Sequence, residues 1–267
     1  MNWLASILYG IISGFAEILP ISSSAHQILM QKLFGAEAGG LRNLLVHASI
    51  LAVLLYCMRP VMVAINVRTE QRRNKKRRSP DLRLVRTAAV PLVLSFLLFR
   101  FAGGLGNNAV YLTLLFLVNG IILYIPSRML SGNKDARAMS GWDALLIGFF
   151  GALGVVPGIS RVGASLFAAS ARGADRQNAL NWVLLLCIPA LILLIVLDIL
   201  AVFAGGFGVG SVAEMFKCIL SVLGAGCGSY FGIMLMRFLS VKAGFTAFAY
   251  YSWGAALFSF VMYLVVV

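Results

Sequence analysis

Six long stretches of apolar residues dominate the chain, and their length predicts transmembrane α-helices. A helix needs about 20 predominantly apolar residues to cross the hydrocarbon core of a bilayer. The stretches are continuous, whereas the strands of a membrane β-barrel alternate between apolar and polar residues. The pattern therefore predicts an all-α, polytopic membrane protein. The first three stretches are short and need flanking residues to complete a crossing. The six predicted spans cover approximately residues 44–58, 87–102, 109–126, 179–204, 212–236 and 243–265.

Two further regions, residues 4–36 and 141–171, are apolar but interrupted in the middle. Pro20 interrupts the first region and Pro157 the second, which leaves arms of about a dozen residues on either side. Such arms are too short to span a bilayer. We expect each region to form a re-entrant helix–turn–helix hairpin, which enters and leaves the membrane on the same side.

The two predicted hairpins resemble each other, which indicates an internal repeat. When Pro20 is placed on Pro157 without gaps, Ser23 falls on Ser160, and small or apolar residues match through most of the first arm. Each half then holds one hairpin and three spans, and an odd number of spans inverts the second half. Inverted repeats place their ligand site near the midplane, where the broken helices meet. The predicted halves are residues 1–126 and 127–267 of a single integral membrane domain, residues 1–267.

The composition agrees with a membrane protein and excludes several other classes. The chain has 267 residues, of which 61% are hydrophobic and 12% charged, and its mean hydropathy is +0.93. Soluble domains carry about 25% charged residues. A soluble enzyme, a disordered chain and a disulfide scaffold are therefore excluded. The four cysteines are isolated in apolar segments without a CxxC pair, so we interpret them as small buried side chains.

The net charge of +13 indicates the orientation of the chain. Nine of the 22 Lys and Arg residues lie between Arg68 and Arg86. Basic residues in short loops mark the cytoplasmic side of a membrane protein, and the alternative for such a cluster is nucleic-acid or partner binding. We favour membrane orientation, expect no nucleic-acid partner, and place a basic loop at residues 59–86 in the cytoplasm. Both termini and the opening of the first hairpin then lie outside. Lys32 and Arg42 do not fit this layout.

Ionisable residues within the apolar segments are the first candidates for function, because each is costly to keep in a membrane. The clearest of them are Glu17, His26, His47 and Arg161.

The first hairpin turn carries the sequence GFAEILPISSSAH. Pro20 cannot continue a helix and fixes the turn, and the serines at 22–24 begin the second helix. A helix start with hydroxyl groups and free backbone N–H groups binds phosphate well. Glu17 precedes this turn, and His26 follows it within the first turn of the new helix.

The second hairpin turn carries the sequence PGISRVGAS. Gly158 permits a close backbone approach, Ser160 supplies a hydroxyl group, and Arg161 supplies a forked cation suited to phosphate oxygens. The two turns together offer a carboxylate, an imidazole, a guanidinium, several hydroxyls and two helix N-termini. This set suits phosphoryl transfer, in which catalysis rests mostly on positioning and charge stabilisation.

Each of these residues also has a simpler interpretation. Ser22 and Ser24 fit ordinary helix capping as well as they fit a phosphate site. Glu17 alone fits a proton relay, and His47 fits a histidine that packs between helices. A GxxxGxxxG stripe predicts close helix packing rather than a site. The stripe consists of Gly224, Gly228 and Gly232.

The two motifs resemble the signatures of the bacterial undecaprenyl-diphosphate phosphatases of the bacitracin-resistance type. Those signatures run approximately E/Q-G-x-x-E-F-L-P-x-S-S-[ST]-G-H and P-G-x-S-R-S-G-x-[ST]. The resemblance implies an inverted-repeat fold, a site that opens to the outer face of the bacterial plasma membrane, and a divalent cation, Mg or Ca. It also implies hydrolysis of undecaprenyl diphosphate to undecaprenyl phosphate, which recycles the lipid carrier for cell-wall synthesis and confers bacitracin resistance.

The resemblance also implies roles for single residues. Glu17 matches an acidic position that is a metal ligand, and Ser23 matches the nucleophile or a phosphate ligand. His26 is then a general base or acid, and Arg161 stabilises charge on the transferring phosphoryl group. The implied phosphate-binding set consists of Ser22, Ser24, Gly158, Ser160 and Ser165.

The chain departs from the signatures at several positions. Ser13 stands at the first acidic or amide position, Ala25 replaces a glycine, and Val162 replaces a serine. The loss of one carboxylate implies that metal dependence is weaker or rearranged. It also favours an alternative from another class, a lipid-phosphate transporter or flippase that uses the site only for binding, since inverted repeats and broken helices are transporter features. The oligomeric state stays open, with a homodimer as one alternative.

Overall fold

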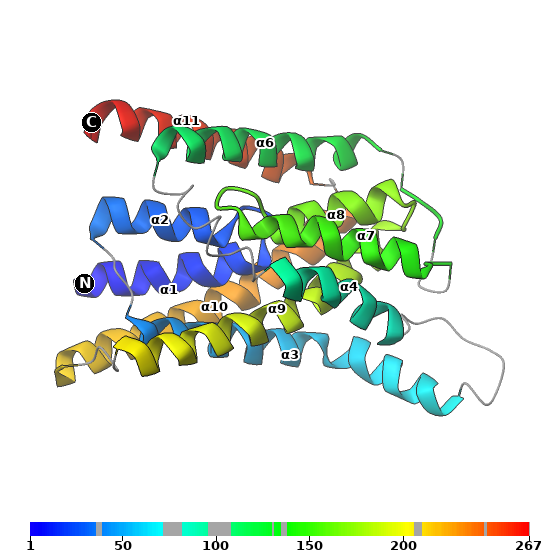
Figure 1. Ribbon diagram of the computed structural model, residues 1–267, viewed down its shortest axis with the longest axis horizontal. Helices are drawn as coiled ribbons and strands as arrows, with labels where there is room; N and C mark the ends of the chain where they lie inside the picture. Colours follow the sequence, from blue (N-terminus) through cyan, green and yellow to red (C-terminus); the bar gives the residue numbers. More distant parts are fainter. Residues whose placement is uncertain are drawn as a thin grey trace.

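The computed structural model of the protein describes residues 1–35, 39–71, 82–95, 108–129, 131–134, 138–205, 210–242 and 245–266. These residues are almost entirely helical, and the helices lie roughly along one long axis (Figure 1). The elements are α1 (Trp3–Ile18), α2 (Ser23–Phe34), α3 (Gly40–Gln71), α4 (Leu82–Ser95), α6 (Ala109–Arg128), α7 (Gly141–Ala152), the 3₁₀-helix η3 (Leu153–Val155), α8 (Arg161–Ala171), α9 (Arg176–Gly205), α10 (Val212–Lys242) and α11 (Thr246–Val266).

The prediction of an all-α, polytopic fold is confirmed. Within the described residues, five helices are long and apolar enough to cross a membrane, and each coincides with a predicted span. The remaining predicted span, residues 87–102, begins in α4, and its residues 96–102 lie outside the described part of the chain. The five candidate spans are Gly40–Met62, Val110–Arg128, Arg176–Gly205, Val212–Leu239 and Thr246–Val265.

The predicted boundary of the basic loop at residue 59 is wrong. Helix α3 continues through Pro60 to Gln71, and α4 begins at Leu82, while residues 72–81 lie outside the described part of the chain. Polar and basic residues form helices as readily as apolar ones, and a proline removes only one hydrogen bond from a membrane helix that its neighbours support. The end of the apolar pattern therefore marks the end of the apolar segment, not the end of the helix.

Both interrupted regions form two helices joined by a turn. Helices α1 and α2 have 16 and 12 residues, and α7 and α8 have 12 and 11. At about 1.5 Å per residue, no one of these four arms matches the roughly 30 Å of a bilayer's hydrocarbon core. The pairs occupy opposite halves of the long axis, and their turns approach each other near its middle (Figure 1).

The first hairpin is held in place by close backbone packing between α1 and α10. A methyl group added at Gly10 or Gly14 of α1 would collide with the backbone of α10, and one at Gly228 would collide with the carbonyl group of Ile11. The predicted glycine stripe on α10 is thus confirmed as a packing surface, because only glycine leaves room for the two backbones to approach.

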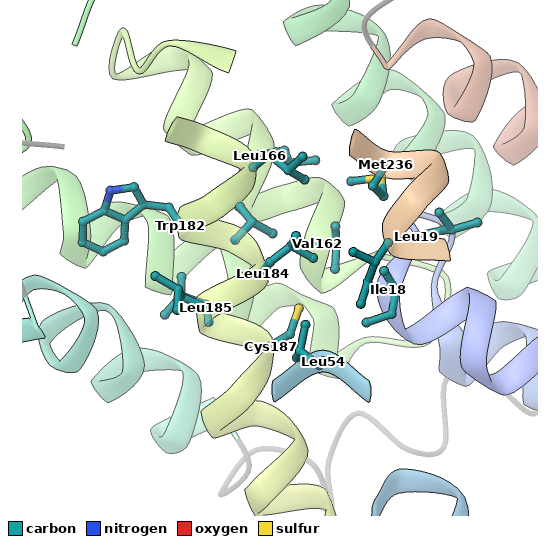
Figure 2. Packing of buried hydrophobic residues seen from close by; sticks show 14 of the residues in the cluster. Ile18, Leu19, Leu54, Val162, Leu166, Trp182, Leu184, Leu185, Cys187 and Met236 are labelled. Carbon is teal, nitrogen blue, oxygen red and sulfur yellow. The ribbon is translucent and has the colours of Figure 1, made fainter. Parts of the chain in front are cut away.

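The end of α1 is also seated in the apolar core. Ile18 is fully buried, and Figure 2 shows Ile18 and Leu19 near Val162 of α8, Leu184 of α9 and Met236 of α10. The last turn of α1 therefore has a fixed position relative to the start of α8.

The charged residues at the predicted outer end of the bundle are paired. Arg42, which does not fit the predicted layout, contacts Glu214 at 3.0 Å, and Lys217 contacts the same carboxylate at 2.7 Å. One carboxylate thus offsets part of the positive charge at this end. Near the other end, Asp143 at the start of α7 forms ion pairs with Lys134 and Arg172.

Replacing Gly228 with alanine should weaken the α1–α10 contact. The added methyl group overpacks the contact, so we expect the free energy of unfolding to fall by about 1–3 kcal/mol. Unfolding in mixed detergent micelles measures this difference. Gly205→Ala is the matched control, since a methyl group there has no neighbouring atom within 4 Å. Equal stability of the two variants would contradict the close packing.

Candidate active site

The two hairpin turns are joined directly by a hydrogen bond. The backbone N–H of Gly158 donates to the hydroxyl oxygen of Ser22 at 3.0 Å. Ser22 precedes α2, yet its side chain makes no capping bond to its own helix, so the capping interpretation does not describe it. Its φ angle is 69°, a conformation that costs a non-glycine residue about 1–3 kcal/mol. The cross-link to the other turn helps to stabilise this strained conformation.

Asn119 of α6 ties the same two turns together a second time. Its side-chain N–H groups donate to the carbonyl oxygen of Pro20 at 3.1 Å and to the hydroxyl of Ser252 at 2.9 Å. Its side-chain oxygen accepts from the backbone N–H of Ser160 at 2.8 Å. Asn119 is fully buried, and these bonds satisfy its donors and its acceptor. The sequence prediction did not include Asn119, although a single amide within an apolar span was a usable signal.

An ion pair lies where the turns meet. The carboxylate of Glu17, in the last turn of α1, contacts the guanidinium of Arg161, the first residue of α8, at 2.8 Å. The Glu17 side chain is 3% exposed and that of Arg161 is 16% exposed. Each charge lies at the helix end that the helix dipole disfavours, since acidic groups are stabilised at N-termini and basic groups at C-termini. Helix stability therefore does not explain these two residues.

Serine hydroxyls surround the ion pair. Ser23 lines the same small cavity as Glu17, and the Ser24 and Ser22 oxygens are 3.5 Å apart. Ser160 caps α8 by accepting from the N–H of Gly163 at 3.2 Å. The small cavity among these groups is lined by Ala16, Glu17, Ser22, Ser23, Ser24, Gly154, Ile159, Ser160, Arg161 and Val162.

This cavity is small in the structure. Its free volume of about 10 Å³ is the space that a single water molecule requires. The Glu17–Arg161 pair occupies the place where the two helix starts converge. The free volume of this cavity is therefore too small for a phosphate group.

Three of the predicted site residues do not line the polar cavity: Gly158, whose N–H bonds to Ser22, and also Ser165 and His26. Ser165 is one helical turn beyond the start of α8, and its hydroxyl donates to the carbonyl of Ile147 at 3.2 Å. The ring of His26 faces two apolar grooves instead, with Nδ1 2.8 Å from the carbonyl oxygen of Ser22 and Nε2 2.7 Å from the hydroxyl of Tyr251. The structure thus brings Glu17, Arg161 and the serines at 22–24 together, and places His26 beside them.

The two apolar grooves adjoin the hairpin turn from the side of α1, α2, α10 and α11. Their free volumes are about 440 and 430 Å³, within the range of small-molecule pockets. Ile12, His26 and Tyr251 line both grooves, which makes them neighbours. The remaining lining residues are Phe15, Leu19, Ile21, Leu235, Leu239, Ala247 and Phe248 in one groove and Leu29, Met30, Leu33, Phe34, Gly254, Ala255 and Phe258 in the other.

Known proteins resemble this chain over nearly its whole length. A family model described as "Bacitracin resistance protein BacA" matches residues 6–258. The chain belongs to the BacA family. It is 31% identical to undecaprenyl-diphosphatase 3 of Bacillus cereus over 264 residues, which covers 96% of each chain. It is also 31% identical to an undecaprenyl-diphosphatase of Carboxydothermus hydrogenoformans, over 95% of this chain and 94% of the relative.

Membership of the BacA family, together with the five candidate spans, identifies the chain as a multi-pass membrane protein. The number of carboxylates at the site bears on whether it could hold a metal ion. Among the described residues there is no group of three His, Cys, Asp or Glu side chains that would enclose a metal ion. Glu17 is the single carboxylate among the lining residues of the polar cavity, and Ser13, buried in α1, cannot supply another.

A second buried pair connects α3 and α9 in this BacA family member. Nδ1 of His47 lies 2.6 Å from a carboxylate oxygen of Asp198, and the two side chains are 8% and 14% exposed. The interpretation of His47 as a histidine that packs between helices describes its burial but not its partner. Asp198 was not among the predicted residues, because an aspartate near the end of a span has no visible partner in the sequence.

Removal of Asp198 should destabilise the bundle. Asp198→Ala leaves His47 without its hydrogen-bond partner in a buried position, and an unsatisfied buried polar group costs about 1–3 kcal/mol. The double replacement His47→Leu, Asp198→Leu should recover most of that loss. Glu214→Ala, at the more exposed pair with Arg42, should cost less than about 1 kcal/mol. Unfolding in mixed micelles compares the four proteins, and an Asp198→Ala protein as stable as Glu214→Ala would contradict the buried pair.

Proposed function

We propose that this BacA family member hydrolyses undecaprenyl diphosphate to undecaprenyl phosphate and inorganic phosphate in the bacterial plasma membrane. The observation that carries the proposal is the Glu17–Arg161 pair, surrounded by serine hydroxyls at two helix starts and placed directly beside two apolar grooves. Relatives that match over nearly the whole chain are named undecaprenyl-diphosphatases. The reaction returns the lipid carrier to cell-wall synthesis and would confer resistance to bacitracin.

The substrate has two parts that suit the two parts of the site. A prenyl chain fills the apolar grooves, and the diphosphate lies between the starts of α2 and α8, where free backbone N–H groups favour an anion. Arg161 then exchanges the carboxylate of Glu17 for phosphate oxygens, which its forked guanidinium binds in pairs. This exchange enlarges the small cavity. It also frees the Glu17 carboxylate to accept a proton from the nucleophile.

The chemical step follows from the neighbours of Glu17. The Ser23 hydroxyl, or a water molecule in its place, attacks the terminal phosphorus, and the bond from that phosphorus to the bridging oxygen breaks. The proton of the nucleophile passes to Glu17, and the electron pair leaves with the lipid monophosphate. Arg161 and the helix N-termini stabilise the charge on the transferring group. If Ser23 is the nucleophile, attack by water then releases phosphate from the serine.

A divalent cation, Mg or Ca, is part of the proposal in a limited form. One carboxylate does not enclose an ion, but magnesium is commonly held by one or two carboxylates together with the phosphates of the substrate. Glu17 and the diphosphate oxygens make up such a set. When bound, the cation would neutralise charge on the phosphoryl group, as Arg161 does.

The proposed membrane topology has six spans, with α4 and the residues after it as the sixth, and two re-entrant hairpins that enter from opposite sides. The opposite positions of the hairpins along the long axis support an inverted repeat of residues 1–126 and 127–267 (Figure 1). The first hairpin opens to the outside, which gives the site access from the outer leaflet. The start of α1 and the end of α11 lie at the same end of the bundle, as an even number of spans requires.

A transporter or flippase for a lipid phosphate is the second candidate. The serine at position 13 in place of an acidic residue favours it, because a site that only binds phosphate needs fewer carboxylates. In that case Glu17 and Arg161 would act as an ion pair that phosphate opens and closes, without hydrolysis.

Phosphate release from undecaprenyl diphosphate in detergent micelles tests the proposal. Arg161→Ala and Glu17→Gln should each lower kcat by about 100- to 1,000-fold, the range for losing a group that stabilises the transition state. Glu214→Gln, a paired carboxylate outside the site, should retain activity. The assay is run with EDTA, Mg²⁺ and Ca²⁺ in turn. Release by the unaltered protein no faster than by the two site variants in every condition would contradict hydrolysis and leave the transporter.

A reporter fused within residues 72–78 should behave as cytoplasmic, because this basic segment follows α3 on the inner side of the proposed topology. A fusion within residues 206–209 should behave as external. Alkaline phosphatase, which is active only outside, gives a readout for both positions. Activity at the first position would overturn the orientation, and with it the outward opening of the site.

A further inference from the structure

The ring of His26 is held by contacts on several sides. One ring nitrogen, Nδ1, lies 2.8 Å from the carbonyl oxygen of Ser22, and the other, Nε2, lies 2.7 Å from the hydroxyl of Tyr251 on α11. The tyrosine ring is nearly parallel to the imidazole, with centroids 5.7 Å apart and an interplanar angle of 15°. Phe116 of α6 contacts the imidazole edge-on, with centroids 5.6 Å apart.

These contacts determine which nitrogen carries the proton. A backbone carbonyl only accepts hydrogen bonds, so Nδ1 must carry the hydrogen that it donates to Ser22. In the neutral ring, Nε2 is then unprotonated and accepts from the O–H group of Tyr251. Nε2 is therefore the nitrogen that exchanges a proton when His26 acts as an acid or a base, and Tyr251 is its partner.

The pair lies at the boundary between the apolar grooves and the polar cavity. His26 and Tyr251 line both grooves, and neither lines the cavity that holds Glu17 and Arg161. Ser22 connects the two regions, because its carbonyl accepts from His26 while Ser22 itself lines the polar cavity and its hydroxyl accepts from Gly158 of the other turn. A lipid diphosphate with its chain in a groove and its terminal phosphate in the cavity passes its inner phosphate by this boundary.

We propose that Tyr251 is a positioning residue for His26: its hydroxyl holds the imidazole through the hydrogen bond to Nε2 and keeps that nitrogen, where His26 gains and loses a proton, beside the inner phosphate of the substrate. The proposal rests on the proposed hydrolysis. Once Nε2 of His26 has taken up a proton, His26 donates it to the oxygen that leaves with the lipid phosphate, while Glu17 accepts the proton of the nucleophile at the other end of the breaking bond. Tyr251 acts through His26 and takes no part in bond breaking.

The first measurement is the ring ¹⁵N spectrum of His26 in detergent micelles. The chain has 2 histidines, so labelled histidine gives two sets of signals, and His26→Gln assigns them. In Tyr251→Phe, the Nε2 signal of His26 should move toward that of an imidazole nitrogen without a hydrogen bond. Tyr250→Phe is the matched control, because Tyr250 is the neighbouring tyrosine on the same helix and its ring contacts Trp253 instead. An unchanged His26 signal in Tyr251→Phe would overturn the proposal.

The second measurement is kinetic. Tyr251→Phe should lower kcat for phosphate release by roughly five- to tenfold, the effect of one lost hydrogen bond, with KM within about twofold and with a changed pH profile. In a His26→Ala background the same replacement should cause no further loss, since coupled residues are not additive. Full activity of Tyr251→Phe, or an equal loss in both backgrounds, contradicts the positioning role while hydrolysis stands. A lack of release by the unaltered protein contradicts hydrolysis itself, and the positioning role with it.

Discussion

The ion pair between Glu17 and Arg161 is the constraint on which the arrangement of the two hairpins depends. Removing an ion from water costs several kcal/mol even after a protein relaxes around it, and each of these charges stands at the disfavoured end of its helix. Neither is stable in the apolar bundle without the other, so the end of α1 and the start of α8 must meet. In the proposed function this pair is also the contact that a ligand would replace, because a phosphate group offers Arg161 the same kind of oxygen that Glu17 does.

The meeting of the two turns is reinforced by groups that carry no charge. Asn119 bonds to Pro20 and to the N–H of Ser160, and Ser22 accepts from Gly158. These bonds hold the backbone of both turns independently of the Glu17–Arg161 ion pair, so the turns would stay joined if Arg161 bound a phosphate as proposed. The neutral hydrogen bonds thus fix the backbone of the two turns. In the proposed function, the Glu17–Arg161 ion pair, which a phosphate would replace, determines the free volume of the polar cavity. Close packing of α1 on α10 fixes the first turn from the opposite side.

The sequence was sufficient to predict most of the helices and the two turns that carry the motifs. Apolar stretches, and apolar stretches interrupted by a proline, are signals that neighbouring residues in the sequence provide. It was insufficient for Asn119 and Asp198, whose partners come from helices far along the chain and are set by packing. Ser165 illustrates a different limit. It belongs to the motif by spacing, but one helical turn carries it away from the polar cavity and toward α7, where its hydroxyl bonds to Ile147. A motif defines residues, whereas the helix geometry decides which of them face the ligand.

An apolar groove next to a charged cavity matches the two parts of a lipid diphosphate, which are an apolar chain and a charged headgroup. In the proposed function its chain would contact apolar side chains such as Ile12, and its phosphates would bind the N–H groups and the guanidinium near Ser22 and Arg161. Residues at the boundary between the groove and the cavity must contact both apolar and charged groups. An imidazole beside a tyrosine can do so, because each ring presents an apolar face and a polar edge. His26 and Tyr251 occupy that boundary. The position of His26 outside the polar cavity is thus consistent with a role at the inner phosphate, where the chain and the charge of the substrate meet.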